Sequence, residues 1–192
     1  MKLKEHNITL HGERVTLRPM TENDWDILLK WNNDPEVLYF TEDGEVSSRS
    51  LEDIQEIYRG VSQNAFCFII EFNGQPIGEC WLQRMNLERL LQKYSDKDCR
   101  RIDLMIGEKS LWGRGLGTDT IRTLTIFGLE KEGADLIFGL VSDYNLRSVG
   151  AFKKVGYVVD PEVEDPSGEK SKFTYDLVIR RDCEEKHETN EK

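Results

Sequence analysis

A short glycine-rich turn constrains the fold of this 192-residue chain more than any other feature. The turn, Gly113-Arg114-Gly115-Leu116-Gly117, follows a strand-like segment at 101–107 and precedes a helix-like segment at 118–131. Glycines let successive backbone N–H groups point to one side, which makes a nest for phosphate oxygens. The amino end of a helix adds free donors and a favourable dipole for an anion. The turn therefore predicts an anion-binding strand, turn and helix, with a simple tight connection as the alternative.

Two common phosphate-binding motifs do not match this turn. A P-loop requires a lysine and then Ser or Thr after its last glycine, whereas Gly117 is followed by Thr118 and Asp119. A dinucleotide-binding turn has GxGxxG spacing and an acid at the end of the next strand. Here every second residue is glycine, and Asp135 precedes the next predicted strand. Neither fold is therefore expected.

The remainder of the chain predicts one mixed α/β (α+β) domain over residues 1–181. Two helices are expected to begin at caps near Thr21 and Ser50, and two more are expected over 118–131 and 145–155. Strands are expected at 14–18, 65–72, 77–85, 101–107, 136–141, 156–158 and 172–180, with a hairpin turn at Asn73-Gly74. We expect loops at 35–48, an irregular charged flap at 86–99 and a charged, disordered tail at 182–192. The result is a sheet of six to seven strands flanked by about four helices.

Composition narrows the possible partners. A formal net charge of −10 argues against a nucleic-acid-binding surface and is compatible with a cationic small molecule. No run approaches the roughly 20 apolar residues of a membrane helix. The four cysteines form no CxxC pair, and the three histidines lie far apart, which disfavours disulfide frameworks and metal sites. We expect a cytoplasmic protein with reduced thiols, no metal, and a monomeric or homodimeric state.

Two segments together resemble a known family. The run from Ile102 to Thr118 resembles motif A of the GNAT family of N-acetyltransferases, and the run from Asn145 to Tyr157 resembles its motif B. The opening Gly12–Met20 is similar to the first strand of the branch that contains ribosomal-protein and aminoglycoside acetyltransferases. The resemblance spans roughly residues 12 to 180. It implies a sheet splayed in the middle and acetyl-CoA as the acetyl donor.

The same resemblance implies a binding site for the donor. The amides of Arg114, Gly115, Gly117 and Thr118 would hold the CoA pyrophosphate, the backbone of Met105 and Ile106 would pair with the pantetheine arm, and the Asn145 side chain would bond to that arm. Asn145 equally fits a helix N-cap, and the two roles are compatible. Trp112 stands where the family usually has Gln or Arg, a change that we expect to be tolerated because backbone donors make the anion contact.

Transfer to an amine requires a group that handles a proton, because an ammonium ion has no lone pair. Asp103 lies in the strand before the turn, where aminoglycoside 6′-N-acetyltransferases carry an aspartate. The resemblance implies that it is the general base or the amine-anchoring acid. The alternative is a surface aspartate paired with Arg100 or Arg101. Phe152 replaces the tyrosine that protonates the leaving thiolate in many members, so CoA would leave as a thiolate, or Ser148, a water or another tyrosine (Tyr144 or Tyr157) would serve.

Aromatic and acidic side chains are expected to form the acceptor pocket, because they suit a polycationic sugar through stacking and charge pairing. The candidates are Tyr39, Phe40, Glu79, Trp81 and Asp103, with Trp31, Glu42, Asp43 and the flap residues Asp96 and Asp98. The aminoglycoside enzymes also place an acid shortly before motif B, where this chain has Leu140. The leading hypothesis is direct acetyl transfer to a primary amine, with an aminoglycoside 6′-amine as the acceptor. The alternatives are acetylation of a protein N-terminus and a non-catalytic acyl-CoA-binding protein.

Overall fold

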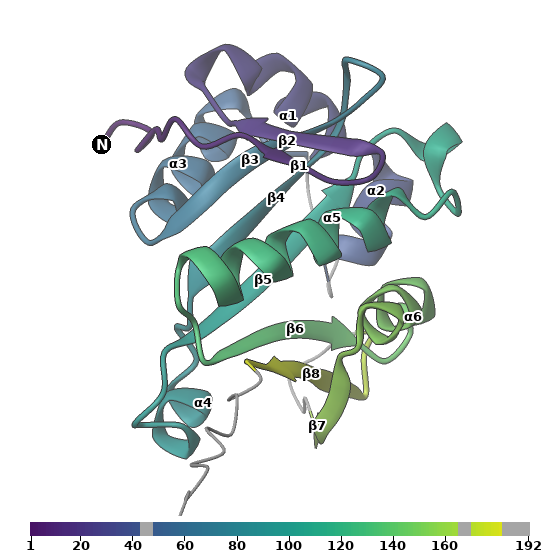
Figure 1. Cartoon of the computed structure of the whole chain (residues 1–192). Coiled ribbons are helices and arrows are strands. Elements are labelled where there is room, and N and C mark those ends of the chain that lie inside the picture. The colour runs from purple at the N-terminus through teal and green to yellow at the C-terminus, as the bar shows by residue number, and fades with distance from the viewer. Residues whose placement is uncertain (43–47, 165–169, 182–192) are drawn as a thin grey trace, which may run out of the picture.

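The computed structural model describes residues 1–42, 48–164 and 170–181. An eight-stranded sheet runs through them in the order β1-β2-β3-β4-β5-β6-β8-β7 (Figure 1). Neighbouring strands are antiparallel except for β5 and β6. The strands are β1 Leu10–His11, β2 Val15–Pro19, β3 Ala65–Phe72, β4 Gln75–Arg84, β5 Cys99–Ile106, β6 Leu136–Ser142, β7 Val158–Glu164 and β8 Phe173–Arg180.

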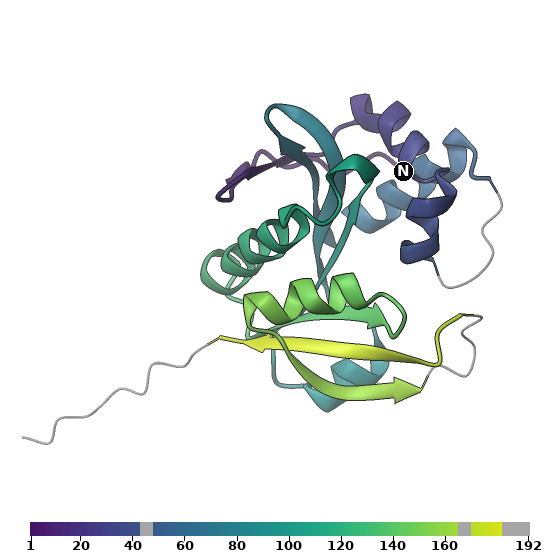
Figure 2. The same cartoon turned by 90° about the vertical axis from the view of Figure 1, so that its right-hand side faces the viewer.

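Helices cover both faces of the sheet. On one face lie α1 Trp25–Trp31, α2 Pro35–Thr41 and α3 Leu51–Ser62, and on the other lie α5 Leu116–Ile126, which continues as a π-helical turn at Phe127–Lys131, and α6 Leu146–Val155 (Figure 2). The remaining helix, α4 Glu88–Lys93, packs Leu90 with Leu136 and Phe138 of β6. Alternate residues of β6 point the other way, where Gly139 makes room for Phe152 of α6. The sheet is thus buried on both sides.

Local sequence signals account for several element ends. Ser50 and Asp53 form a capping box at the start of α3. Asn73 and Gly74 both have positive φ, 53° and 72°, as the two central residues of a tight hairpin between β3 and β4 require. The predicted helix start at Ser50 and the predicted hairpin turn at Asn73-Gly74 are therefore confirmed. Both could be predicted because they depend on contacts between residues close together in the chain.

The middle of the sheet is splayed, as the resemblance implied. The strands β5 and β6 pair only from Cys99 to Arg101 on β5. Beyond that point β5 continues to pair with β4 as far as Ile106, while β6 continues to pair with β8 as far as Ser142. The two halves of the sheet therefore diverge, and the open edge of β5 faces a wedge-shaped gap that holds the cavities described below.

Three sequence predictions need correction. The sheet has eight strands and the described residues form six α-helices, against six to seven strands and about four helices predicted. The predicted loop at 35–48 was wrong in its first half, because Asp34 caps the amides of Glu36 and Val37 and Pro35 occupies the first turn of α2. The flap at 86–99 contains α4, and Arg89 of that helix forms a bidentate ion pair with Asp176, which is fully buried in β8. The predicted tail at 182–192 lies outside the described residues.

Candidate active site

Two cavities meet at the splayed edge of β5. We call the first the turn cavity; its volume is about 410 Å³, and it runs from the end of β5 past the glycine turn to α6. The second, the carboxylate cavity, has a volume of about 330 Å³ and lies between α2, α3, β4, β5 and the start of α6. Both are lined by Phe40, Thr41, Leu104, Met105, Asn145 and Ser148. A molecule in one cavity can therefore reach a molecule in the other at this shared wall.

The residues of the glycine turn line the turn cavity. Gly113 and Gly115 adopt left-handed conformations with φ of 75° and 80°, and Gly115 is the N-cap of α5. Among the described residues, no backbone or side-chain oxygen accepts from the five amides between Arg114 and Thr118. The side chains of Arg147 and Lys154 also line the cavity. Free amides, a helix amino end and two cations together fit the diphosphate of a nucleotide such as CoA.

A buried aspartate fastens the back of the turn. Asp119, in the first turn of α5, accepts hydrogen bonds from the amides of Glu13 at 3.2 Å, Arg14 at 2.8 Å and Val15 at 3.1 Å. The Arg14 guanidinium also donates to the carbonyl of Arg114 at 2.6 Å. The start of the chain thus holds the turn in place. Sequence reasoning missed this role, because a single aspartate after a glycine turn does not reveal a partner about 105 residues away.

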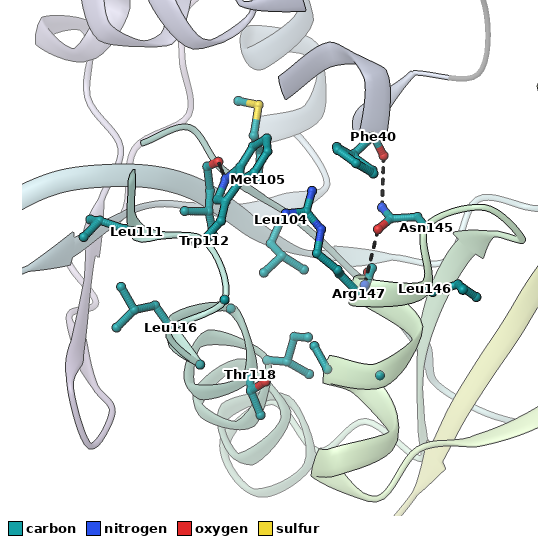
Figure 3. A pocket seen from close by; sticks show the side chains of 18 of the residues that line it. Phe40, Leu104, Met105, Leu111, Trp112, Leu116, Thr118, Asn145, Leu146 and Arg147 are labelled. Atoms are coloured by element: carbon teal, nitrogen blue, oxygen red, sulfur yellow. Dashed lines mark hydrogen bonds between the residues drawn. The ribbon is translucent and has the colours of Figure 1, made fainter. Parts of the chain in front are cut away.

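Trp112 and Arg147 close one side of the turn cavity (Figure 3). The indole N–H of Trp112 donates to the carbonyl of Ile106 at 2.7 Å. The Arg147 guanidinium lies 4.3 Å from the Trp112 ring centroid and 4.2 Å from that of Phe40. Trp112 therefore fixes the end of β5 through its ring, which gives this residue a structural purpose where the family usually has Gln or Arg.

Asn145 connects α6 to α2 across the gap (Figure 3). Its Oδ1 accepts from the Ser148 amide at 3.3 Å, which confirms the predicted N-cap, and its Nδ2 donates to the Phe40 carbonyl at 3.1 Å. The same Nδ2 is the donor that was expected to meet pantetheine. Its role as a ligand of the donor substrate stays a prediction.

Asp103 lies in the carboxylate cavity and is held by three donors. Arg101 donates to it twice, from Nε at 2.7 Å and from Nη2 at 2.6 Å, and the Trp81 indole N–H donates at 3.0 Å. Trp81 and Asp103 are directly opposite each other in the β4–β5 register. The pairing with Arg101 that the sequence left open is therefore present, inside the cavity rather than on the outer surface.

Glu79 lies beside Asp103 and is far more deeply buried. It is 3% exposed, lines the carboxylate cavity, and its Oε2 has no hydrogen-bond partner within the described part of the chain. Burial raises the pKa of Glu79 well above its usual range, and the charge of Asp103 raises it further. A hydrogen bond with the Tyr58 hydroxyl lowers this pKa, as the smallest of the three effects. The cavity thus holds a carboxyl group that gains a proton much more readily than an ordinary glutamate.

Of the other predicted acceptor residues, Phe40, Glu42 and Trp81 line the carboxylate cavity. Tyr39 is 52% exposed and packs against Phe40 and Tyr144, and it is not among the residues that line either cavity in the described structure. Trp31 is buried in the core and donates to Glu108. Asp43 lies outside the described residues. The expected contribution of the flap acids was wrong, because Asp98 pairs with Arg100 and Asp96 with Lys97 near the start of β5, away from the cavity lining.

The structure also distinguishes the candidates for a general acid by whether they line the two cavities. Ser148 lines both cavities and lies at the shared wall. Tyr157 is buried, and its hydroxyl shares a hydrogen bond with Thr125. Tyr144 donates to the carbonyl of Glu42. Phe152 lines the carboxylate cavity and is anchored against Gly139. Ser148 is therefore the candidate with direct access to both cavities.

Within the described ranges, no helix has the length and apolar character to cross a membrane, and no three His, Cys, Asp or Glu side chains come together as a metal site would require.

Comparisons with known proteins agree with this geometry. Residues 14–158 match the family model described as an acetyltransferase (GNAT) domain. The aminoglycoside N(6′)-acetyltransferase type 1 of Klebsiella pneumoniae is 28% identical over 166 residues, which cover 84% of this chain and 82% of that protein. The solved structure of AAC(6′)-Ib with ribostamycin and coenzyme A is 27% identical and superposes with a TM-score of 0.77 over 93% of this chain and all of that one (100%). A spermidine N-acetyltransferase from Vibrio cholerae shares the fold, with a TM-score of 0.72 at 16% identity over 88% of this chain and 97% of that one.

The family match covers residues 14–158, which is most of the chain. The chain therefore belongs to the GNAT acetyltransferase family and is an acetyl-CoA-dependent N-acetyltransferase.

Proposed function

We propose that this enzyme acetylates a small polycationic amine, and that its substrate is the 6′-amine of an aminoglycoside. The observation that carries this proposal is the carboxylate cavity, which places Glu42, Glu79 and Asp103 beside the aromatic rings of Phe40 and Trp81. The cavity opens onto the turn cavity at Met105. An amine bound there would lie next to the thioester of a donor held by the turn.

The charges in the cavity favour a cationic guest. Glu42 pairs with Arg49 at 2.7 Å and Asp103 pairs with Arg101 at 2.6 Å. Glu79 pairs with no cation among the described residues. A buried carboxylate is stable as an anion only with a partner of opposite charge. A substrate ammonium would supply that partner, and the aromatic faces would receive its further positive groups.

The proposed roles at the donor site follow from the turn geometry. The amides of Arg114, Gly115, Gly117 and Thr118 hold the pyrophosphate, the backbone of Met105 and Ile106 aligns the pantetheine arm, and Asn145 exchanges its bond to Phe40 for one to that arm. Asp103, fixed by Arg101 and Trp81, anchors the acceptor amine. The relatives named as aminoglycoside acetyltransferases support this choice of substrate.

Two assays test the proposal in sequence. Acetyl-CoA should raise the melting temperature of the purified protein, and no shift at saturating ligand would refute the donor site. Release of free CoA should then be measured with neomycin and with paromomycin, which carry an amine and a hydroxyl at the 6′ position respectively. Release with neomycin but not with paromomycin is expected. Release with N-terminal peptides of ribosomal proteins instead would indicate a protein acceptor, and no release with any amine would indicate an acyl-CoA-binding protein.

A further inference from the structure

Glu79 is a buried carboxyl group whose hydrogen bond to Tyr58 leaves one of its two oxygens unused among the described residues. It is 3% exposed, and its Oε2 makes no hydrogen bond within the described residues. Buried polar atoms are nearly always hydrogen-bonded, and an exception needs an explanation. Glu79 lines the carboxylate cavity, so the missing partner is one that the cavity can receive.

The sheet register places Glu79 closer to the donor than Asp103. In the β4–β5 ladder, Glu79 is opposite Met105 and Trp81 is opposite Asp103. Directly opposed residues project from the same face of a sheet. Met105 lines both cavities, whereas Asp103 lines only the carboxylate cavity. Glu79 therefore projects beside the shared wall where the two substrates meet, about 7 Å further along the strands than Asp103.

The oxygens of Asp103 are already engaged. Its Oδ1 accepts from Arg101 at 2.6 Å, and its Oδ2 accepts from Arg101 at 2.7 Å and from Trp81 at 3.0 Å. A proton arriving on this carboxylate would break charge-assisted bonds to a guanidinium, which are among the strongest in proteins. The arrangement suits a fixed anchor rather than a proton acceptor.

We propose that Glu79 is the proton acceptor of the acetyl transfer, and that Asp103 positions the amine for it. This inference rests on the proposed function, because it requires an amine in the carboxylate cavity. The ammonium reaches Glu79 as the counter-ion of its carboxylate, and burial of this pair favours transfer of the proton, because the products are a neutral carboxylic acid and a neutral amine. Moving the proton from the ammonium to Glu79 therefore exposes the lone pair at little cost.

The charged and titratable groups around Glu79 favour transfer of the proton from the ammonium to this carboxylate. Asp103 from β5 raises the pKa of Glu79, and Tyr58 from α3 lowers it. Arg101 is bonded to Asp103, and Arg49, which precedes α3, is bonded to Glu42 and Asn32. Cys67 of β3 is a buried thiol whose own pKa is raised to about 12, so it is neutral. No cation in the described structure bonds directly to Glu79, so its proton affinity stays high.

The chemical step balances without a further reactant. One proton passes from the ammonium nitrogen to Glu79, and the nitrogen lone pair forms the new C–N bond to the acetyl carbonyl carbon. The C–S bond breaks and its electron pair leaves on sulfur. The second nitrogen proton is lost as the amide forms, sulfur takes up one proton, and Glu79 returns the other to solvent.

The test compares kcat as a function of pH for the wild-type enzyme and four variants, with acetyl-CoA and whichever amine of the panel is turned over. Glu79→Gln should lower kcat by about 100-fold or more and abolish the acid limb of the profile. Glu79→Asp should have a kcat between those of wild type and Glu79→Gln, and its pH profile should again show an acid limb. Asp103→Asn should raise KM for the amine and shift the acid limb to lower pH, because the charge that raises the pKa of Glu79 is gone. Glu71→Gln is the matched control, since Glu71 is on the neighbouring strand β3 and pairs with Arg18 outside both cavities.

Glu79→Gln with a kcat within threefold of wild type and an intact acid limb would overturn the inference, as would loss of the limb in Asp103→Asn alone. An equal acetyl-CoA melting shift in all variants shows that they fold and bind the donor. The inference and the proposed substrate fail separately: turnover of another amine in place of neomycin refutes only the substrate. If no amine is turned over, infrared difference spectra across a pH titration decide: the neutral carboxyl band of Glu79, identified by its loss in Glu79→Gln, should appear on acidification at a higher pH than that of an ordinary glutamate (about 4.3). Appearance of the band only at or below that pH, or its presence at every pH tested, would overturn the inference.

Discussion

Replacing Asp119 by asparagine should destabilise the protein strongly. The Asp119 carboxylate accepts three backbone amide bonds, two on Oδ2 from Arg14 and Val15 and one on Oδ1 from Glu13. Its side chain is 6% exposed, so water cannot replace those bonds. An asparagine can keep the two bonds to one oxygen in neutral form, but its NH₂ group would face the Glu13 amide donor to donor.

The size of the effect follows from these contacts. A hydrogen bond to a charged group contributes about 1.5–3 kcal/mol, and a neutral one contributes about 0.5–1.5 kcal/mol. Losing one bond outright and the charge from two others should cost about 2–4 kcal/mol. In a chain of this length, each kcal/mol corresponds to roughly 2–4 °C in melting temperature, so Asp119→Asn should melt about 5–15 °C lower.

The assay is thermal unfolding followed by circular dichroism, with Asp96→Asn as the control. The Asp96 side chain is 78% exposed and forms an ion pair with the neighbouring Lys97 at 3.3 Å, so its replacement should change the melting temperature by no more than about 2 °C. A melting temperature of Asp119→Asn within 2 °C of that control would refute the view that this carboxylate fastens the start of the chain to α5.

Three further predictions concern single positions. Gly115→Ala forces a non-glycine residue into φ of 80°, so it should cost about 1–2 kcal/mol and reduce the acetyl-CoA melting shift; an unchanged shift would contradict the role of the turn. Gly60→Ala in α3, where an added Cβ meets no atom within 4 Å, should instead stabilise by about 0.5–1 kcal/mol in chemical denaturation, and a loss of stability would contradict the open surface there. Burial lowers the pKa of His6 below 6.5, so the unfolded chain takes up the proton first and the unfolding free energy should fall as the pH drops below about 6.5. His6→Gln should lack this loss between pH 7 and pH 5, and an identical pH dependence in both proteins would show that His6 is not its source.

Sequence reasoning succeeded where neighbouring residues specify the structure. The caps at Ser50 and Asn145 and the hairpin at Asn73-Gly74 depend on contacts within a few residues, and all three are present. The glycine turn likewise predicted a helix amino end with free amides. The predicted loop at 35–48 failed in its first half because α2 is only seven residues long, and its position depends on distant partners such as Asn145.

The partners of each carboxylate could not be predicted from the chain alone. Asp103 and Glu79 were both named as candidates, but their different roles depend on a β4–β5 register that sets Trp81 against one and Met105 against the other. Asp96 and Asp98 lie just before β5, at the opposite end of this strand from Met105, where they form ion pairs with Lys97 and Arg100.

The sequence by itself determined every strand except β1, most of the helices and the anion-binding turn, because hydrophobic periodicity, caps and glycine conformations act over a few residues. Only the tertiary structure decided which acid is held by Arg101 and which is buried with one oxygen that no described residue bonds to. Burial and strand register arise from residues far apart in the chain, and they set the proton affinity of each group through solvation and neighbouring charge.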